Sequence, residues 1–254
     1  EQKSFLKKGY VIFDIKEVKS LKYIEKNIKE YLYKITKKNF NLNDTHKYIP
    51  KNKLNTYRLD IINKINNNKA FDQNYFQLSE SILNEIIGNE IVMQNEISLS
   101  IQLPKDSSSL LPIHADTWSG NSPYEVVIWI PLVDVYKTKS MYIFNKKFSQ
   151  KTLKNLKNYK YKGMSTIYSN NKNKKKFIAL KKGQFLLFSP NLLHGNVKNM
   201  TSETRISMNT RFKNLFSTYG EKSQIGKRIG YFYIPFKVKP ITKFALEFDI
   251  PNEF

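Results

Sequence analysis

The sequence predicts an α+β fold in which helices from the N-terminal third pack on the outside of an antiparallel β-core. Two observations predict this: apolar residues recur at helical spacing before residue 90, and short segments rich in Val, Ile, Phe and Tyr follow from residue 91 onward. No linker divides the 254 residues. We therefore expect a single domain over residues 1–254, with a mainly helical part (1–90) and a β-rich part (91–254).

The helical part contains three segments with apolar stripes. Residues 18–36 repeat apolar side chains at spacings of three and four, and residues 53–66 and 76–87 show similar stripes. A short strand over residues 10–15 precedes them. We also expect a small helix over residues 149–162, inserted between two strands of the second part.

The β-rich part contains seven segments that are short, rich in β-branched and aromatic residues, and bounded by turn residues. They cover residues 91–103, 126–135, 141–144, 177–180, 184–189, 205–212 and 231–238. Residues 170–176 are expected to form a solvated hairpin tip. Seven or eight antiparallel strands behind a helical region favour a double-stranded β-helix, the jelly roll of cupin-like barrels.

The composition excludes several classes of protein. Hydrophobic residues make up 40% and aromatic residues 14%, which excludes a disordered chain. No apolar run approaches the roughly 18 residues that a transmembrane helix needs, and the first ten residues do not form a secretory signal. Cysteine is absent, so disulfides and thiolate metal sites are excluded. We expect a cytoplasmic protein without a membrane partner.

The net charge of +22 comes from 43 basic and 21 acidic residues, and such a field attracts nucleic acid and other anions. Arginine occurs only at Arg58, Arg205, Arg211 and Arg228. The lysines are scattered among Asn and Ile, which indicates the codon bias of an adenine- and thymine-rich genome. Proteins that read nucleic acid usually employ arginine. We therefore expect a small-molecule substrate rather than a nucleic-acid partner, and the sequence leaves the oligomeric state open.

Two of the three histidines lie in a pattern typical of a metal site. His114 and Asp116 are two residues apart, so on an extended chain their side chains leave the same face. His194 follows an apolar strand and a short turn, whereas His46 is expected at the surface. Two imidazoles and one carboxylate on one face of an octahedral ion leave three positions open, as in non-haem Fe(II) oxygenases. We predict His114, Asp116 and His194 as metal ligands and catalytic residues.

A cosubstrate pocket is predicted behind the metal. Arg205 lies eleven residues after His194, and polar and apolar residues alternate along its strand. A bidentate 2-oxo acid suits two open positions of Fe(II) and O2 suits the third, while Arg205 would hold the distal carboxylate of 2-oxoglutarate. A buried arginine is rarely tolerated without an anion. Ser207 is on the same face of the strand, and Gln102 on an earlier strand is either a further contact or an exposed residue.

The sequence around the metal motif resembles a known family. The resemblance is carried by residues 111–142, LPIHADTWSGNSPYEVVIWIPLVDVYKTKSMY. They resemble the 2-oxoglutarate- and Fe(II)-dependent oxygenases of sporadic carbohydrate-biosynthesis clusters, relatives of an oxygenase of streptomycin-type pathways, in the superfamily of the phytanoyl-CoA hydroxylases. The resemblance implies that His114, Asp116 and His194 bind iron and that Arg205 with Ser207 binds 2-oxoglutarate. Because related halogenases have a small residue in place of Asp116, hydroxylation is favoured over chlorination.

Several further residues are candidates for substrate contacts. Four of them directly follow the metal motif and would surround the mouth of the iron site: Trp118, Asn121, Tyr124 and Glu125. Trp118 fits a packing role equally well. Arg211, on the same strand face as Arg205, is placed to meet substrate or to stabilise a metal-ligand carboxylate. Lys139, in a predicted turn, is expected to be exposed, and Trp129 is expected in the core.

The leading functional hypothesis is hydroxylation of a small polar, carbohydrate-derived substrate, where the sugar part comes from the resemblance alone. The alternative is a nucleic-acid demethylase of the same fold, because such enzymes carry two arginines six residues apart, as Arg205 and Arg211 are. A binding module on a cupin-like barrel would have no need of all four site residues. A zinc hydrolase would lack an obvious base except Glu125. Desaturation, epimerisation and ring closure would use the same iron site.

Overall fold

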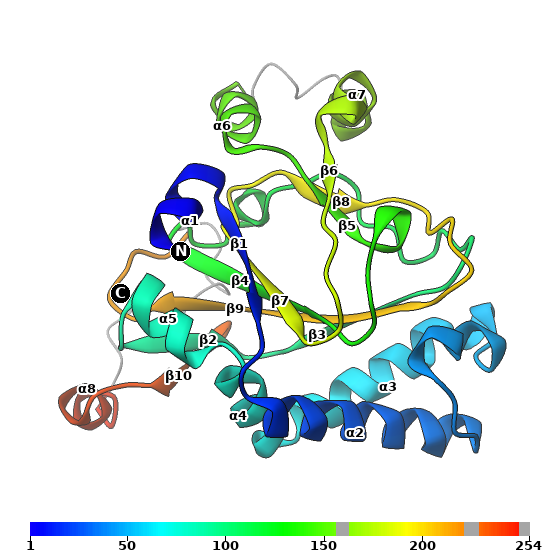
Figure 1. The fold of residues 1–254 in the computed structure, drawn as a ribbon. Coiled ribbons are helices and arrows are strands. Elements are labelled where there is room, and N and C mark those ends of the chain that lie inside the picture. Colours follow the sequence, from blue (N-terminus) through cyan, green and yellow to red (C-terminus); the bar gives the residue numbers. More distant parts are fainter. Residues whose placement is uncertain (156–162, 221–228, 249–254) are drawn as a thin grey trace.

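Two antiparallel sheets form the centre of the protein, with helices outside them, in the computed structural model of Figure 1. The structure describes residues 1–155, 163–220 and 229–248. The helices are α1 (Gln2–Lys8), α2 (Val18–Thr36), α3 (Leu54–Asn66), α4 (Lys69–Gln77), α5 (Glu80–Ile87), α6 (Lys146–Lys154), α7 (Gly163–Asn171) and α8 (Pro240–Ala245). The strands are β1 (Tyr10–Asp14), β2 (Ile91–Gln94), β3 (Ser98–Gln102), β4 (Glu125–Pro131), β5 (Met141–Ile143), β6 (Lys176–Phe177), β7 (Gln184–Phe188), β8 (His194–Asn196), β9 (Arg205–Asn214) and β10 (Tyr233–Lys237).

The larger sheet has the strand order β1-β7-β4-β9-β2-β10, and β3 also pairs with β9. β9 organises this sheet because it is long enough to pair with β4 along one edge and with both β3 and β2 along the other. In the register of β3 with β9, Gln102 lies opposite Arg205 and Ser100 lies opposite Ser207. The polar residues predicted on two separate strands are therefore neighbours in the sheet.

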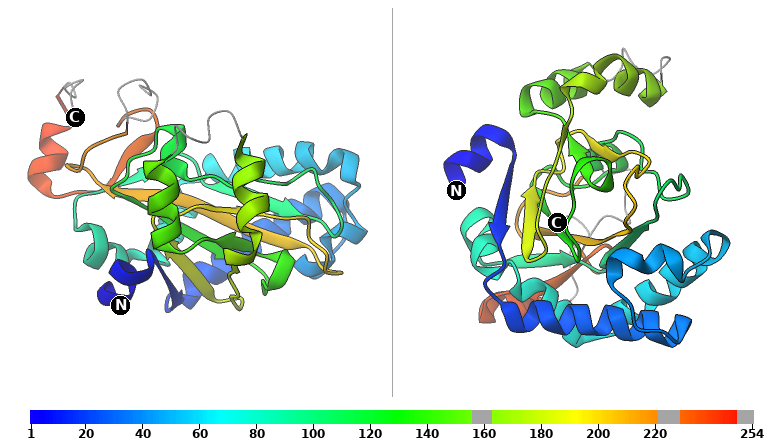
Figure 2. Two further views of the ribbon diagram at one scale, coloured as in Figure 1. Left: turned by 90° about the horizontal axis from the view of Figure 1, so that it is seen from above. Right: turned by 45° about the vertical axis from the view of Figure 1, so that its right-hand side comes forward.

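Helices α2, α3 and α4 lie along one face of the larger sheet (Figure 2). Their apolar stripes form the main core with the strands, and Ile24, Ile61 and Phe71 are completely buried. Burial of a side chain of this size stabilises the fold by roughly 1.5–3 kcal/mol. The Tyr75 hydroxyl of α4 donates a hydrogen bond of 3.0 Å to the Ile128 carbonyl of β4, which ties the helical layer to the sheet.

The smaller sheet has the order β6-β5-β8 and lies on the opposite side of the molecule from α2 and α3 (Figure 1). Tyr142 and Phe144 pack in a second apolar cluster with Ile167 of α7. Met141 is adjacent to Tyr142 in β5, so its side chain points to the other face of the sheet. There it lines a cavity that residues of β3 and β9 also line. One face of this sheet thus packs against a helix, and the other helps to enclose a cavity.

The segment predicted as one strand over residues 91–103 is two strands, β2 and β3, separated by a break. The break has a specific cause: the Asn66 side chain, at the end of α3, accepts a hydrogen bond of 2.7 Å from the Ile97 amide and donates one of 3.1 Å to the Ile97 carbonyl. A side chain therefore satisfies the backbone groups that a continuous ladder would use. The helix predicted over residues 76–87 is likewise divided, at Leu78 and Ser79, between α4 and α5.

Other boundaries also differ from the prediction. Residues 170–176 do not form a hairpin tip, because α7 continues to Asn171 and a short 3-10 helix (Lys172–Lys174) leads into β6. The helix expected over residues 149–162 begins earlier, as α6, and residues 156–162 lie outside the described residues. Helices α1, α7 and α8, residues 69–75 of α4 and the short strand β8 were not predicted. Within the described part of the chain, no helix combines the length and apolarity needed to span a bilayer.

Candidate functional site

The structure brings His114, Asp116 and His194 together at one end of the smaller sheet. One ligand atom from each lies within 4.8 Å of the others. The Asp116 Oδ1 atom is 3.5 Å from His114 Nε2 and 3.8 Å from His194 Nε2. The backbone enforces this approach, because His114 and His194 exchange two backbone hydrogen bonds of 2.9 Å and the Asp116 amide donates to the Pro190 carbonyl. Two imidazoles and a carboxylate therefore converge on one point.

Both imidazoles are oriented for metal binding by the backbone. Nδ1 of His114 donates to the Pro112 carbonyl at 2.7 Å, and Nδ1 of His194 donates to the Leu192 carbonyl at 2.8 Å. Because a carbonyl oxygen only accepts, the proton of each neutral ring is on Nδ1 and the Nε2 lone pair is free. Burial lowers the pKa of His194 to about 4, so its ring is neutral near pH 7. A neutral imidazole is the form that binds a metal ion.

Arg211 binds Oδ2, the second carboxylate oxygen of Asp116. Its guanidinium lies 2.9 Å (Nη2) and 3.2 Å (Nε) from Asp116 Oδ2, so Oδ1 is left for the histidine side. Burial alone would raise the pKa of the Asp116 carboxyl, but Arg211 and the two imidazoles hold that pKa well below its usual range. The same guanidinium is 3.4 Å from Glu125 Oε1 and donates to Gln94 at 2.7 Å. Arg211 therefore positions a candidate metal ligand.

Arg205 is buried, and no carboxylate in the described part of the chain forms an ion pair with it. Its side chain is 3% exposed, donates one hydrogen bond of 3.0 Å to the Ser100 hydroxyl, and has a buried Nε atom with no partner. Burial lowers the pKa of this guanidinium to about 10, and no carboxylate of the described residues pairs with it to offset that effect. The Ser207 hydroxyl, two residues along the same strand face, is also buried and unpaired. Unsatisfied donors of this kind require an explanation, and a carboxylate ligand supplies one.

Gln102 is fully buried rather than exposed, and its position is opposite Arg205 in the sheet. Its amide nitrogen donates to the Val197 carbonyl at 2.7 Å, which leaves its carbonyl oxygen without a partner. In this orientation the free atom is an acceptor, so Gln102 suits a donor such as a guanidinium better than a carboxylate.

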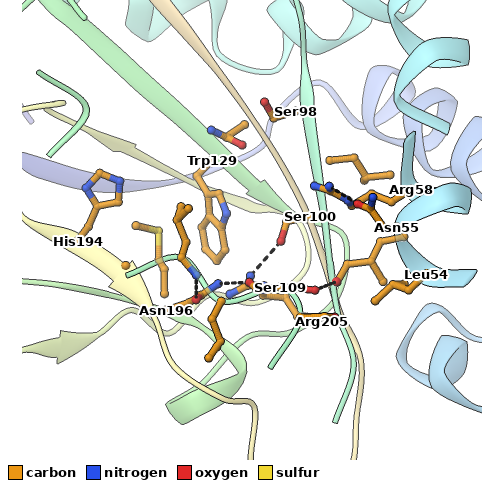
Figure 3. A pocket seen from close by; sticks show the side chains of 18 of the residues that line it. Leu54, Asn55, Arg58, Ser98, Ser100, Ser109, Trp129, His194, Asn196 and Arg205 are labelled. Carbon is orange, nitrogen blue, oxygen red and sulfur yellow. Dashed lines mark hydrogen bonds between the residues drawn. The ribbon is translucent and has the colours of Figure 1, made fainter. Parts of the chain in front are cut away.

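A cavity of about 550 Å³ is lined by some of these residues (Figure 3). His194, Arg205 and Arg211 line it together with Trp129, which is also 7% exposed and part of the core. Its wall is otherwise rich in hydroxyl and amide groups: Asn55, Ser98, Ser100, Ser108, Ser109, Asn196 and Asn209. The volume is within the range of small-molecule sites, which span roughly 300–1,000 Å³.

The candidates that follow the metal motif lie elsewhere. Glu125 is buried away from this cavity, accepts a hydrogen bond from Asn121 and pairs with Arg211 and Tyr233; burial raises its pKa to about 7. Tyr124 is 61% exposed, and Trp118 packs against the second apolar cluster. Of the five substrate candidates, the described lining of the cavity contains only Arg211.

One wall of the cavity, contributed by α3 and the turn before it, was not predicted from the sequence. Lys51, Asn55 and Arg58, in α3 and the turn before it, line the cavity together with the serines of β3. Arg58 had a detectable signal, since it is one of only four arginines in a lysine-rich chain. The hydrophobic pattern of α3 shows which face is buried but not which end of the sheet it covers.

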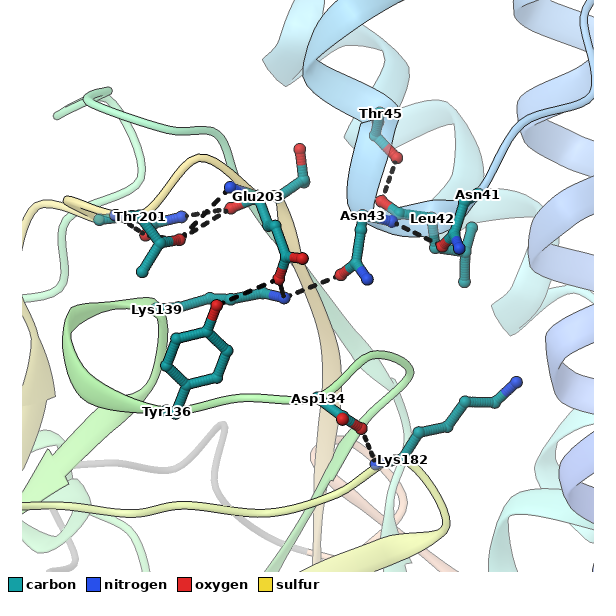
Figure 4. A network of polar contacts seen from close by, with 12 residues as sticks. Asn41, Leu42, Asn43, Thr45, Asp134, Tyr136, Lys139, Lys182, Thr201 and Glu203 are labelled. Atoms are coloured by element: carbon teal, nitrogen blue, oxygen red, sulfur yellow. Dashed lines mark hydrogen bonds and ion pairs between the residues drawn. The ribbon is translucent and has the colours of Figure 1, made fainter.

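The expectation of an exposed Lys139 is wrong. Its side chain is completely buried and pairs with Glu203 at 2.7 Å and with Asn43 at 2.8 Å (Figure 4). A buried ammonium needs such partners, so Lys139 joins the turn before β5 to the loop that leads into β9. His46 is half-buried rather than at the surface, and its ring lies 3.0 Å from the Thr204 hydroxyl, next to Arg205.

No protein-family model matches the sequence, and no curated protein is significantly similar to it. Solved structures do share the fold. EctD from S. alaskensis, with 2-oxoglutarate and 5-hydroxyectoine, superposes with a TM-score of 0.59 at 13% identity, covering 94% of this chain and 83% of EctD. HygX from Streptomyces hygroscopicus, with nickel and 2-oxoglutarate, gives 0.54 at 12% identity, covering 85% and 87%. The nickel complex of ThoJ, a non-heme monooxygenase, gives 0.54 at 15% identity, covering 96% and 92%.

Proposed function

We propose that this protein is an Fe(II)- and 2-oxoglutarate-dependent dioxygenase built on a double-stranded β-helix. The observation that carries the proposal is a single cavity lined by both the metal-binding histidine His194 and the unpaired, buried Arg205. The two residues supply what such an enzyme needs in one place: a metal ligand and a partner for a dianionic cosubstrate. The fold shared with EctD and HygX, both solved with 2-oxoglutarate, supports the same conclusion.

His114, Asp116 and His194 would hold the metal ion through the two Nε2 atoms and Asp116 Oδ1. Two nitrogen ligands and one carboxylate suit Fe(II) and leave coordination positions for other ligands. Bound Fe(II) supplies the activation of O2 that is coupled to oxidative decarboxylation of 2-oxoglutarate to succinate and CO2. The chain's own residues bind, orient and shield the reactants around that chemistry.

Arg205 would bind the distal carboxylate of 2-oxoglutarate through its unpaired Nε, and Ser207 would donate its free hydroxyl hydrogen. Arg211 keeps Asp116 ionised and fixed, and each histidine keeps its proton on Nδ1, which donates it to a backbone carbonyl. Gln102 helps to shape the arginine pocket. Glu125, with Asn121, would act through Arg211. Neither these two residues nor Trp118 and Tyr124 would contact the substrate.

The substrate that we propose is small, polar and carbohydrate-derived, and its C–H bond is hydroxylated. The hydroxyl- and amide-rich wall supports this, because hydroxyl groups of a sugar both donate and accept hydrogen bonds. The resemblance of residues 111–142 to oxygenases of carbohydrate clusters points to the same class. Trp129 offers an apolar surface in the same cavity.

The test measures succinate formed from 2-oxoglutarate by the Fe(II)-loaded protein. We expect His114→Ala and Asp116→Ala to abolish it, because each removes one of three ligands, while circular dichroism shows a retained fold. Asp14→Ala is the matched control, since Asp14 is an exposed carboxylate on the edge strand β1. Turnover that persists in the two ligand variants, or after complete iron removal, would overturn the proposal.

A further inference from the structure

The wall of the cavity contributed by α3 is basic and has no partner for its charge. In Figure 3 the Arg58 guanidinium and the His194 imidazole lie on opposite sides of the cavity. Arg58 donates one hydrogen bond, of 2.6 Å, to the Asn55 side chain. Neither it nor Lys51, which lines the same wall, forms an ion pair with any residue that the structure describes. A guanidinium has five N–H donors, so most of those of Arg58 are available.

The use of arginine at this position is informative because the chain uses lysine almost everywhere else. Only four of its 43 basic residues are arginines, and the fourth, Arg228, is outside the described residues. The other three, Arg58, Arg205 and Arg211, all line this cavity. Arginine differs from lysine in its planar fork, which binds carboxylate or phosphate through two parallel hydrogen bonds. Arg205 and Arg211 have anionic partners in the proposed enzyme, whereas the described partner of Arg58 is the neutral side chain of Asn55.

The other residues that line the cavity also favour a negatively charged ligand. The described lining residues include four cationic side chains and no aspartate or glutamate. Among the described residues, the carboxylates that pair with Arg211 are Asp116 and Glu125, neither of which lines the cavity. A dianionic cosubstrate on Arg205 offsets the charge of that arginine but leaves Arg58 and Lys51 without a counter-charge. The end at α3 stays positive and carries Asn55 and Ser98 beside the free guanidinium.

From this arrangement we infer that the substrate carries an anionic oxygen group, a phosphate or a carboxylate, which Arg58 binds with Lys51 at the α3 wall. The hydroxylated part of the substrate then extends from α3 past Ser98 toward His194, beside the cosubstrate on Arg205 and Ser100. This inference rests on the proposed dioxygenase function and specifies its substrate as an acidic sugar derivative. Arg58 would act as a specificity residue that fixes the far end of the substrate and so decides which C–H bond faces the metal.

The test compares three probes by calorimetry on protein loaded with Ni(II) and saturated with 2-oxoglutarate: glucose 6-phosphate, glucuronate and neutral glucose. We expect at least one charged probe to bind more than tenfold more tightly than glucose, the range expected for charge-assisted hydrogen bonds. Arg58→Gln should remove this difference, and Arg58→Lys should keep part of it. Lys53→Gln removes a positive charge next to the same wall, at a residue outside the cavity lining, and should leave the preference unchanged.

Inorganic phosphate serves as a probe that does not depend on the sugar. With 2-oxoglutarate occupying Arg205, we expect phosphate to bind to the wild type and to Lys53→Gln but at least tenfold more weakly to Arg58→Gln. Equal binding to Arg58→Gln, or no preference for any anionic probe over glucose, overturns the inference. A protein that binds neither Ni(II) nor 2-oxoglutarate in the same calorimeter would instead overturn the proposed function, so the two failures are distinguishable.

Discussion

Three cations on one face of β9 differ in function because their neighbours differ. Lys213 donates to the backbone carbonyls of Asn214 and Ser217, each at 2.7 Å, so its role is structural. Arg211 is neutralised by Asp116 and Glu125. Arg205 has only the Ser100 hydroxyl, which leaves its charge uncompensated. The surroundings rather than the residue type therefore indicate which cation binds an external anion.

Removal of the Arg211 guanidinium should weaken metal binding rather than prevent folding. Arg211→Gln leaves Asp116 free to rotate and places its carboxylate beside Glu125 without a counter-charge. Loss of a group that orients a metal ligand typically costs about 10- to 100-fold in metal affinity. We expect a loss of that size in Ni(II) affinity, measured by titration calorimetry.

Arg205→Gln is the control for this experiment because it makes the same substitution on the same strand face. It should leave Ni(II) affinity within about twofold of the wild type, since Arg205 bonds to Ser100 and to none of the three described metal ligands, and should instead weaken 2-oxoglutarate binding. Arg211→Gln with unchanged Ni(II) affinity would contradict the positioning role.

At the scale of the elements, the helical layer contains a carboxylate that the fold does not satisfy. Asp72, in the first turns of α4, has a buried Oδ1 atom without a hydrogen-bond partner, and burial raises its pKa to about 6. Between the unfolded pKa, near 4, and this value, the folded state binds more protons than the unfolded state. The free energy of unfolding therefore decreases as pH rises through this window and is lowest above it.

Asp72→Asn should remove this pH dependence. We expect the variant to be more stable than the wild type above pH 6, by about 1 kcal/mol because partial exposure screens the charge, with the advantage disappearing toward pH 4. Urea unfolding at pH 4, 5, 6 and 8 measures the effect. Asp60→Asn is the control, since Asp60 on α3 already pairs with Lys64. An advantage that is independent of pH would show that Asp72 is not the cause.

At the scale of the whole molecule, local patterns predicted most of the secondary structure, and residues distant in sequence account for the differences. The two-residue spacing of His114 and Asp116 could be read directly, because an extended chain places both side chains on one face. The burial of Lys139 could not, because its partner Glu203 lies 64 residues away. Nor could the break at Ile97, which depends on Asn66, 31 residues earlier. Arg58 faces the cavity only because α3 packs across that end of the sheet.

The net charge of +22 is also a property of the whole molecule. Because it attracts DNA, the salt dependence of DNA binding is the starting point for testing the alternative of a nucleic-acid demethylase. Scattered lysines should bind any DNA at low salt, because the phosphate backbone attracts them without regard to sequence. If about six phosphates are neutralised, affinity should fall by roughly a thousandfold between 50 and 200 mM salt. Fluorescence anisotropy with a labelled oligonucleotide measures this dependence.

The decisive comparison is made at the higher salt, where this unspecific attraction is screened within about 8 Å. There we expect a methylated single-stranded oligonucleotide neither to bind measurably nor to increase succinate formation from 2-oxoglutarate. The physical reason is that Arg211, the second arginine such an enzyme would use, is already neutralised by Asp116 and Glu125. Stimulation by the methylated strand but not by its unmethylated counterpart would show that the cavity accepts a nucleobase, and the acidic-sugar assignment would then be wrong.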